Sequence, residues 1–122
     1  MKKVLIVDDE EDVDFLIQQK FRKEIQDKRL CFLFARNGRQ ALSLVEAHED
    51  IDLVITDINM PAMNGIELLR RIKAYNPLTH VMVVSAYTDD HHQSLAEQGG
   101  ADGFISKPID LKSLEKIVLS LP

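Results

Sequence analysis

The amino-acid sequence predicts an α/β fold in which a parallel β-sheet is covered by helices on both faces. Short apolar runs alternate five times with longer segments whose apolar residues recur at helical spacing. The short runs lack alternating polar positions, which is typical of strands buried on both faces. The chain has 122 residues, a length that suits one compact domain, so we expect residues 1–122 to form a single domain.

The first two strand–helix units open the chain. Residues 4–7 read Val-Leu-Ile-Val and are predicted to be a strand, which residues 11–28 follow as a helix. The apolar residues of this helix lie at helical spacing: Val13, Leu16, Ile17, Phe21 and Ile25. Residues 31–35 are the second predicted strand. A turn at Asn37-Gly38 precedes a second helix, whose apolar face is Ala41, Leu42 and Val45.

The third unit begins with a strand over residues 53–55 and continues through a loop over 60–65. Its helix has Ile66, Leu69 and Ile72 at helical spacing. Asn76-Pro77 ends this helix, because the residue before a proline disfavours helical geometry.

The last two units follow the same pattern. Residues 81–84 are the fourth predicted strand, and residues 90–98 form a weak helix that Gly99-Gly100 ends. Residues 103–105 are the fifth strand, and Asp110 is the expected N-cap of the last helix. The apolar residues of that helix are Leu111, Leu114, Ile117, Val118 and Leu121.

Five strands in a chain of this length suit a doubly wound, flavodoxin-like (βα)5 sheet. We take its strand order, 2-1-3-4-5, from known sheets of that class and not from the sequence itself. Right-handed crossover connections then determine the handedness of the fold.

Composition narrows the class of function. The net charge of −5 disfavours direct nucleic-acid binding, which requires a basic surface. No apolar run approaches the ~20 residues that a membrane span requires, and the acidic run 8–12 interrupts the first apolar stretch too early for a signal peptide. The single cysteine, Cys31, cannot form an internal disulfide. We therefore expect a cytoplasmic protein that does not bind membranes.

Polar residues directly follow four of the predicted strands, where ligands bind in open α/β sheets. They are Asp8 and Asp9 after the first strand, Asp57 and Asn59 after the third, Ser85 after the fourth and Lys107 after the fifth. In the assumed order the three aspartates converge, and their repulsion is best explained by a bound Mg²⁺ ion. A carboxylate nucleophile, a metal, an ammonium group and a hydroxyl together suit phosphoryl transfer.

Each of these residues also has an ordinary structural explanation. Asp8 and Asp9 suit the first turn of a helix, where the helix dipole favours acids. Asp57 suits an Asx-turn and Ser85 the end of a strand, and a lone Lys107 is most often a surface residue. Their coincidence after four different strands favours a functional site.

The chain resembles the receiver domain of bacterial two-component response regulators from end to end. Four stretches carry the resemblance in order and at family spacing: Val4 to Glu10, Asp57 to Pro61 with Met63-Asn64-Gly65, Val83 to Ala86, and Gly100-Ala101 through Ser106-Lys107-Pro108. The resemblance implies that Asp57 accepts a phosphoryl group. It also implies that Asp9 and Asp57 bind Mg²⁺ through their carboxylates, Asn59 through its backbone carbonyl, and Asp8 through water.

The resemblance further implies the residues of a switch. Lys107 contacts the phosphoryl group and precedes Pro108 at a cis bond, and Ser85 reaches for the phosphoryl oxygens. Phe104 matches the aromatic switch residue, although ordinary strand packing explains it about equally well. Tyr87 lies at a position associated with the rate of dephosphorylation.

The implied partners are a sensor histidine kinase or phosphotransfer protein and an effector domain or downstream protein. The surface expected to change includes the helix at 90–98, the strand at 103–105 and the last helix, and it could also form a homodimer.

Three rival functions remain. In a haloacid-dehalogenase-type phosphatase a second acid stands two residues after the nucleophile, where this chain has Asn59. A nucleotide-binding module would have a glycine-rich loop after the first strand, which this sequence lacks. A degenerate receiver would only bind partners. We therefore expect a phosphoryl acceptor and not a true enzyme.

Overall fold

The sheet of the computed structural model confirms the predicted α/β fold. The structure describes residues 1–60, 63–85 and 90–121. Five parallel strands form one sheet in the order β2-β1-β3-β4-β5. Their bounds are β1 (Lys2–Val7), β2 (Leu30–Ala35), β3 (Leu53–Asp57), β4 (His80–Ser85) and β5 (Gly103–Ser106). Every strand is longer than its predicted apolar run, because apolar residues mark the buried part of a strand while ladder pairing extends to polar ends such as Asp57 and Ser85.

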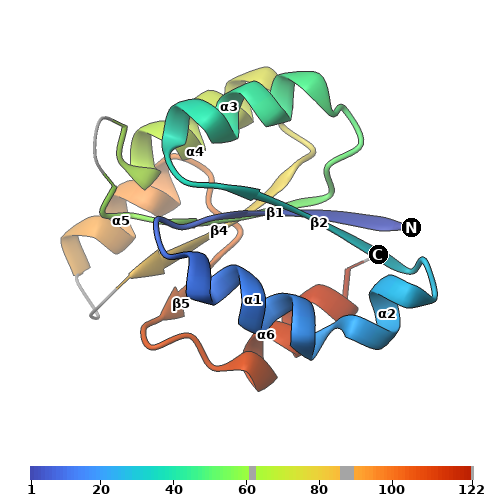
Figure 1. The fold of residues 1–122 in the computed structure, drawn as a ribbon. Coiled ribbons are helices and arrows are strands. Elements are labelled where there is room, and N and C mark those ends of the chain that lie inside the picture. The colour runs from blue at the N-terminus through green and yellow to red at the C-terminus, as the bar shows by residue number, and fades with distance from the viewer. Residues whose placement is uncertain (61–62, 86–89, 122) are drawn as a thin grey trace.

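Helices cover both faces of the sheet (Figure 1). On one face lie α3 (Gly38–Ala47), α4 (Gly65–Tyr75) and α5 (Asp90–Gln98), and on the other lie α1 (Glu11–Lys20), α2 (Arg22–Gln26) and α6 (Leu111–Leu119). Each face has its own apolar core, and neighbouring residues of one strand enter different cores. Leu5 packs with the α3–α4–α5 core, whereas Val4 packs with the α1–α2–α6 core.

The single helix predicted over residues 11–28 is wrong. The structure has two helices there, α1 and α2, because Phe21 between them departs from helical geometry with a φ of −103° and a ψ of 19°. The Phe21 side chain is fully buried, and its ring centroid lies 5.2 Å from that of Phe32. The predicted inner position of Leu16 is also wrong, since its side chain is 49% exposed. Helical spacing identifies an apolar face but does not separate its centre from its edge.

Side-chain caps set where three helices begin. Asn37, Asn64 and Asp110 accept hydrogen bonds from the backbone N–H groups of Gln40, Glu67 and Lys112. Each such cap typically contributes about 1 kcal/mol, and the predicted cap at Asp110 is confirmed. Residues 90–98 are helical as predicted, whereas α6 ends at Leu119 and does not include Leu121. In the described part of the chain, no helix is both long and apolar enough to cross a membrane.

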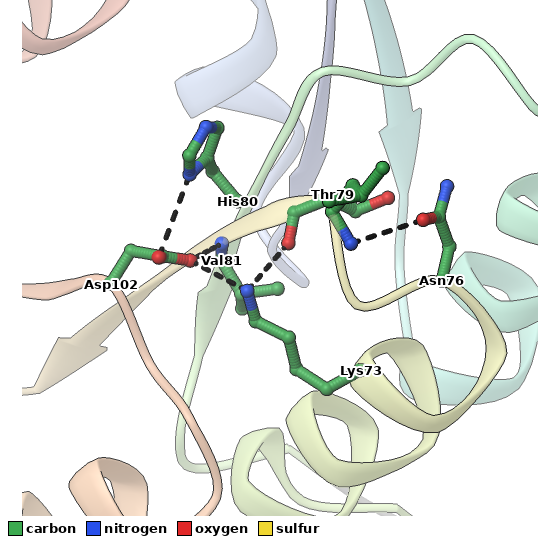
Figure 2. A network of polar contacts seen from close by, with 7 residues as sticks. Lys73, Asn76, Thr79, His80, Val81 and Asp102 are labelled. Carbon is green, nitrogen blue, oxygen red and sulfur yellow. Dashed lines mark hydrogen bonds and ion pairs between the residues drawn. The ribbon is translucent and has the colours of Figure 1, made fainter.

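A polar network joins α4, β4 and β5 at the amino-terminal ends of the two strands (Figure 2). The Lys73 ammonium donates to the Thr79 carbonyl oxygen at 2.7 Å and to Asp102 Oδ2 at 2.9 Å. Asp102 Oδ2 also accepts from the Val81 N–H at 2.7 Å, and His80 Nδ1 lies 3.5 Å from Asp102 Oδ1. Burial alone would raise the pKa of Asp102, but the Val81 N–H and Lys73 outweigh it and hold that pKa below its usual value.

We expect Lys73→Met to lower the free energy of unfolding by about 1 kcal/mol near neutral pH, because both partners are partly solvated. An acid whose folded pKa is depressed stabilises the fold above its unfolded pKa and loses that contribution as pH falls through the folded value. The difference between wild type and Lys73→Met in urea unfolding should therefore shrink below the ordinary aspartate pKa of 3.8. Lys112→Met, which alters an exposed lysine, is the control. A difference of the same size at all pH values would contradict the role of Asp102.

Candidate functional site

The carboxyl ends of four neighbouring strands bring the predicted site residues to one edge of the sheet. Asp8 follows β1, Asp57 ends β3, Ser85 ends β4 and Lys107 follows β5. Because β1, β3, β4 and β5 are consecutive in the sheet, these residues form a row. β1 and β3 are neighbours in the sheet although β2 lies between them in the sequence, so the strand order reverses between them. A doubly wound sheet binds its ligands at this point of reversal.

Asp57 is a buried carboxylate paired with a lysine. Its side chain is 6% exposed, and the Lys107 ammonium lies 2.5 Å from Asp57 Oδ2. Burial alone would lower the pKa of Lys107, but the hydrogen bond and the charge of Asp57 raise it above its usual value. Lys107 therefore carries a full positive charge next to the carboxylate at neutral pH.

Asp8 is a second buried carboxylate in the same place. Its Oδ1 accepts a hydrogen bond from the Glu10 N–H at 2.8 Å. Burial, followed by the negative charge of Asp57, raises the pKa of Asp8, although the Glu10 N–H and the charge of Lys107 act in the opposite direction. Two carboxylates with one ammonium leave an excess of negative charge in a buried site, which favours a cation.

Asp9 and Asn59 differ from the other predicted site residues because both are exposed. The expected convergence of three carboxylates is therefore met by Asp8 and Asp57 alone. Among residues 1–60, 63–85 and 90–121, no group of three or more His, Cys, Asp and Glu side chains is placed to hold a metal ion. Asp9 lies in the bend that follows β1 and is exposed, whereas Asp8 is buried.

Ser85 and Phe104 lie on the same face of the sheet. Phe104 pairs with Val83, and Ser85 is two residues beyond Val83 on the same strand. Ser85 is buried, whereas Phe104 is half-buried and packs against the α3–α4–α5 core. The Lys107 N–H donates to the Ser85 carbonyl at 2.8 Å, and the Lys107–Pro108 peptide is cis, as the resemblance implied. Tyr87 lies outside the described residues, as does Pro61 of the loop after β3.

Gly65 is a site residue that the sequence reasoning missed, because it placed Gly65 in the loop over residues 60–65 and in a stretch that carries the resemblance, but gave it no role. A Cβ atom on Gly65 would lie 2.3 Å from the Asp57 carbonyl oxygen, so only glycine lets α4 begin this close to Asp57. The Gly65 N–H donates to the Ile58 carbonyl at 2.9 Å, and the Ile58 N–H donates to the Val84 carbonyl at 3.1 Å. The sequence feature that could have identified Gly65 is a glycine in the first turn of a helix, directly after the Asn64 cap.

An open groove of about 560 Å³ borders Asp8 and Lys107, between α1 and the segment that follows β5. Its walls are mostly apolar, and its lining is Asp8, Glu10, Val13, Leu16, Ile17, Lys107, Pro108, Ile109 and Leu111. Phe15, next to Leu16 on α1, is 61% exposed. Exposed apolar side chains next to a charged site are typical of a surface that binds a partner.

The chain is similar to proteins of one family throughout. The model of the response regulator receiver domain matches residues 4–119. Sporulation initiation phosphotransferase F of Bacillus subtilis is 36% identical over 118 residues, which cover 96% of this chain and 90% of that protein. A cyclic di-GMP phosphodiesterase of Thermotoga maritima is 36% identical over 91% of this chain, but this chain spans only 28% of that protein. The solved structure of chemotaxis protein CheY4 from Vibrio cholerae has a TM-score of 0.85 and 26% identity, and the match covers 100% of this chain and 99% of CheY4.

Proposed function

The chain belongs to the response regulator receiver domain family, and on that premise we propose that Asp57 accepts a phosphoryl group from a sensor histidine kinase or a phosphotransfer protein. The observation that carries the proposal is the buried Asp57 carboxylate, whose Oδ2 contacts the Lys107 ammonium at 2.5 Å. The proposed place of action is the cytoplasm.

The proposed chemistry is phosphoryl transfer between two side chains. An Asp57 oxygen attacks the phosphorus of a phosphohistidine, a P–O bond forms and the P–N bond breaks. The histidine nitrogen leaves with the bonding electron pair, on a ring whose other nitrogen carries a proton. Lys107 neutralises negative charge on the oxygens of the group in transit, and the buried position of Asp57 keeps bulk water away from it.

We propose Mg²⁺ as the cofactor, and the donor set fits it. Mg²⁺ in phosphoryl-transfer sites is usually held by one or two carboxylates and keeps several of its waters. The buried pair Asp8 and Asp57 has the hard oxygen atoms and the excess negative charge for such an ion. Asp9 and the Asn59 carbonyl, both at the exposed rim, are the further proposed ligands. When bound, the ion shields the repulsion between the acceptor and the incoming phosphoryl oxygens.

The test of this function is phosphorylation without any protein partner. Acetyl phosphate and Mg²⁺ should add one phosphoryl group to the protein, detected by intact mass, and chelation of Mg²⁺ should prevent the addition. A degenerate receiver would show no adduct. A haloacid-dehalogenase-type phosphatase would instead turn over simple phosphate esters, which the exposed amide Asn59 argues against, because an amide cannot act as the general acid.

We infer that the phosphodonor protein binds the groove beside Asp8 and Lys107. A phosphohistidine on a partner must reach Asp57, so the partner must bind close to the carboxyl ends of the strands. This groove is apolar and borders the site, and it has the exposed Leu16 on its wall. Apolar contacts there would hold the donor, while Lys107 faces its phosphoryl group.

The proposed output is a change on the face formed by α5, β5 and α6. A phosphoryl group brings nearly two negative charges and strong acceptor oxygens. The Ser85 hydroxyl is proposed to donate to one of them, and the half-buried ring of Phe104, on the same sheet face, would then move inward. A hydrogen bond to a charged group and part of one ring's apolar area together amount to a few kcal/mol at most, which suffices to shift a two-state equilibrium. The altered face would bind an effector or form a homodimer.

Replacing Ser85 by valine tests this switch, because valine keeps most of the volume and removes the hydroxyl donor. We expect Ser85→Val to accept phosphate more slowly and to lose the phosphorylation-dependent changes on the α5–β5–α6 face. Amide NMR spectra with and without beryllofluoride would show this, with Ser43→Val, at an exposed position of α3 outside that face, as the control. Resonances of α5 and α6 that shift as in wild type would mean that Ser85 is not the trigger.

A further inference from the structure

A second groove lies on the opposite border of the sheet, away from Asp57. It has a volume of about 560 Å³ and runs between the α1–α2 segment and β2. Its apolar floor consists of Met1, Ile25, Leu30, Cys31 and Phe32, and its polar rim consists of Gln18, Arg22, Gln26 and Lys28. Leu30 to Phe32 form the amino-terminal half of β2, whereas the phosphorylation site lies at the carboxyl ends of the strands.

β2 itself is an edge strand. In the described part of the chain it pairs only with β1, and its six residues read Leu-Cys-Phe-Leu-Phe-Ala. An apolar edge strand has backbone N–H and C=O groups that can pair with a further strand, and most proteins protect such edges with charges, prolines or bulges. β2 has none of these residues within its bounds. An extended peptide can therefore add to this edge and place alternate side chains on the groove floor.

The charged residues on the rim, Arg22 and Lys28, are both positive. Among the described residues neither Arg22 nor Lys28 forms a side-chain hydrogen bond or an ion pair, whereas the nearby Lys20 and Arg29 are paired with Glu115 and Asp27. No acidic residue lines the groove, although the whole chain has a net charge of −5. The positive charge of this groove favours an acidic ligand.

Lys28 stands in a conformation that glycine normally occupies. Its φ is +59°, in the left-handed region, and it follows Asp27, the C-cap of α2. The Arg29 N–H donates to the Glu24 carbonyl at 2.9 Å and the Lys28 N–H to the Ile25 carbonyl at 3.1 Å, so the turn is a helix-ending motif in which glycine is the favoured residue. A lysine there is strained, and residues held in such conformations concentrate at functional positions.

We propose that this groove binds an extended, acidic segment of a partner protein, which adds a strand to β2 and places carboxylates against Arg22 and Lys28. The apolar floor favours a peptide with alternating acidic and apolar side chains over a nucleic acid. The site is independent of Asp57, so the chain would have one surface for its phosphodonor and another for this partner.

The probe is a synthetic eight-residue peptide of alternating Glu and Val, with the Lys–Val peptide of the same length as the charge control. The Glu–Val peptide should shift the amide resonances of residues 30–34 and slow their hydrogen exchange, and added salt should weaken its binding. Arg22→Gln and Lys28→Gly should each weaken binding roughly two- to fivefold. Lys23→Gln, which removes an exposed cation of α2 that does not line the groove, should leave binding unchanged.

Lys28→Gly separates function from folding, because glycine takes the left-handed conformation without strain. The variant should be at least as stable as wild type in urea and should still accept phosphate on Asp57 while binding the peptide more weakly. Absence of shifts in residues 30–34, or equal binding by wild type and both groove variants, would overturn the proposal. So would equally tight binding of phosphatidylglycerol vesicles or a single-stranded DNA oligomer, since these would show a surface for anions in general.

Discussion

Asp57→Asn is expected to abolish phosphorylation and to leave the fold intact. An amide is a poor nucleophile, and the other buried carboxylate at the site, that of Asp8, follows the neighbouring strand β1 and accepts a hydrogen bond from the Glu10 N–H. The substitution keeps the shape of the side chain, and the amide oxygen can still accept from Lys107. Intact mass after treatment with acetyl phosphate and Mg²⁺ measures the result.

Asp110→Asn is the matched control for Asp57→Asn. It makes the same chemical change at the exposed N-cap of α6, where asparagine caps as well as aspartate. This variant should be phosphorylated as fully as wild type. A phosphoryl adduct of equal yield on Asp57→Asn would show that Asp57 is not the acceptor.

Gly65→Ala is expected to have the second-largest effect, because it damages both the fold and the site. The added Cβ would lie 2.3 Å from the Asp57 carbonyl oxygen and 2.9 Å from Ile58 Cα, and backbone atoms cannot move aside as a flexible side chain can. Overpacking of this kind costs roughly 1–3 kcal/mol or more. Because relief of the contact must move either the start of α4 or the end of β3, which carries Asp57, phosphorylation by acetyl phosphate should also slow, by up to about a hundredfold for a displacement near 1 Å.

Gly103→Ala is the matched control, since its Cβ would meet only the flexible end of the Met82 side chain, at 2.8 Å from Cε. Gly65→Ala should unfold at a lower urea concentration than Gly103→Ala, and its initial rate of phosphorylation should be lower. If Gly65→Ala unfolds at the same urea concentration as Gly103→Ala and is phosphorylated at the wild-type rate, then the close approach of α4 does not position Asp57.

The two proposed surfaces differ in how they relate to Asp57. The groove at Leu16 is also lined by Lys107, which contacts Asp57, so substitutions there should alter phosphotransfer from a protein donor. The groove at Arg22 and Lys28 lies along the amino-terminal half of β2, so substitutions there should alter peptide binding alone. Phosphorylation by acetyl phosphate, which needs neither surface, distinguishes damage to the site from loss of a partner.

The sequence by itself determined the order of the strands and helices along the chain, apart from the break between α1 and α2, and the polar residues that end the strands. Buried parallel strands must be apolar, and helices must present an apolar face, so the pattern in residues 4–7 or 81–84 reports local structure directly. The same local pattern identified Asp57, Ser85 and Lys107, because each follows a strand.

Only the tertiary structure decided which of those residues meet and how closely. The pairing of Lys107 with Asp57 joins residues 50 positions apart, and the contrast between the buried Asp8 and the exposed Asp9 depends on what packs around each side chain. The break at Phe21, the exposure of Leu16 and the need for glycine at Gly65 have the same origin. Each depends on which atoms of a distant element fill the neighbouring space, and periodicity in one segment contains no information about those atoms.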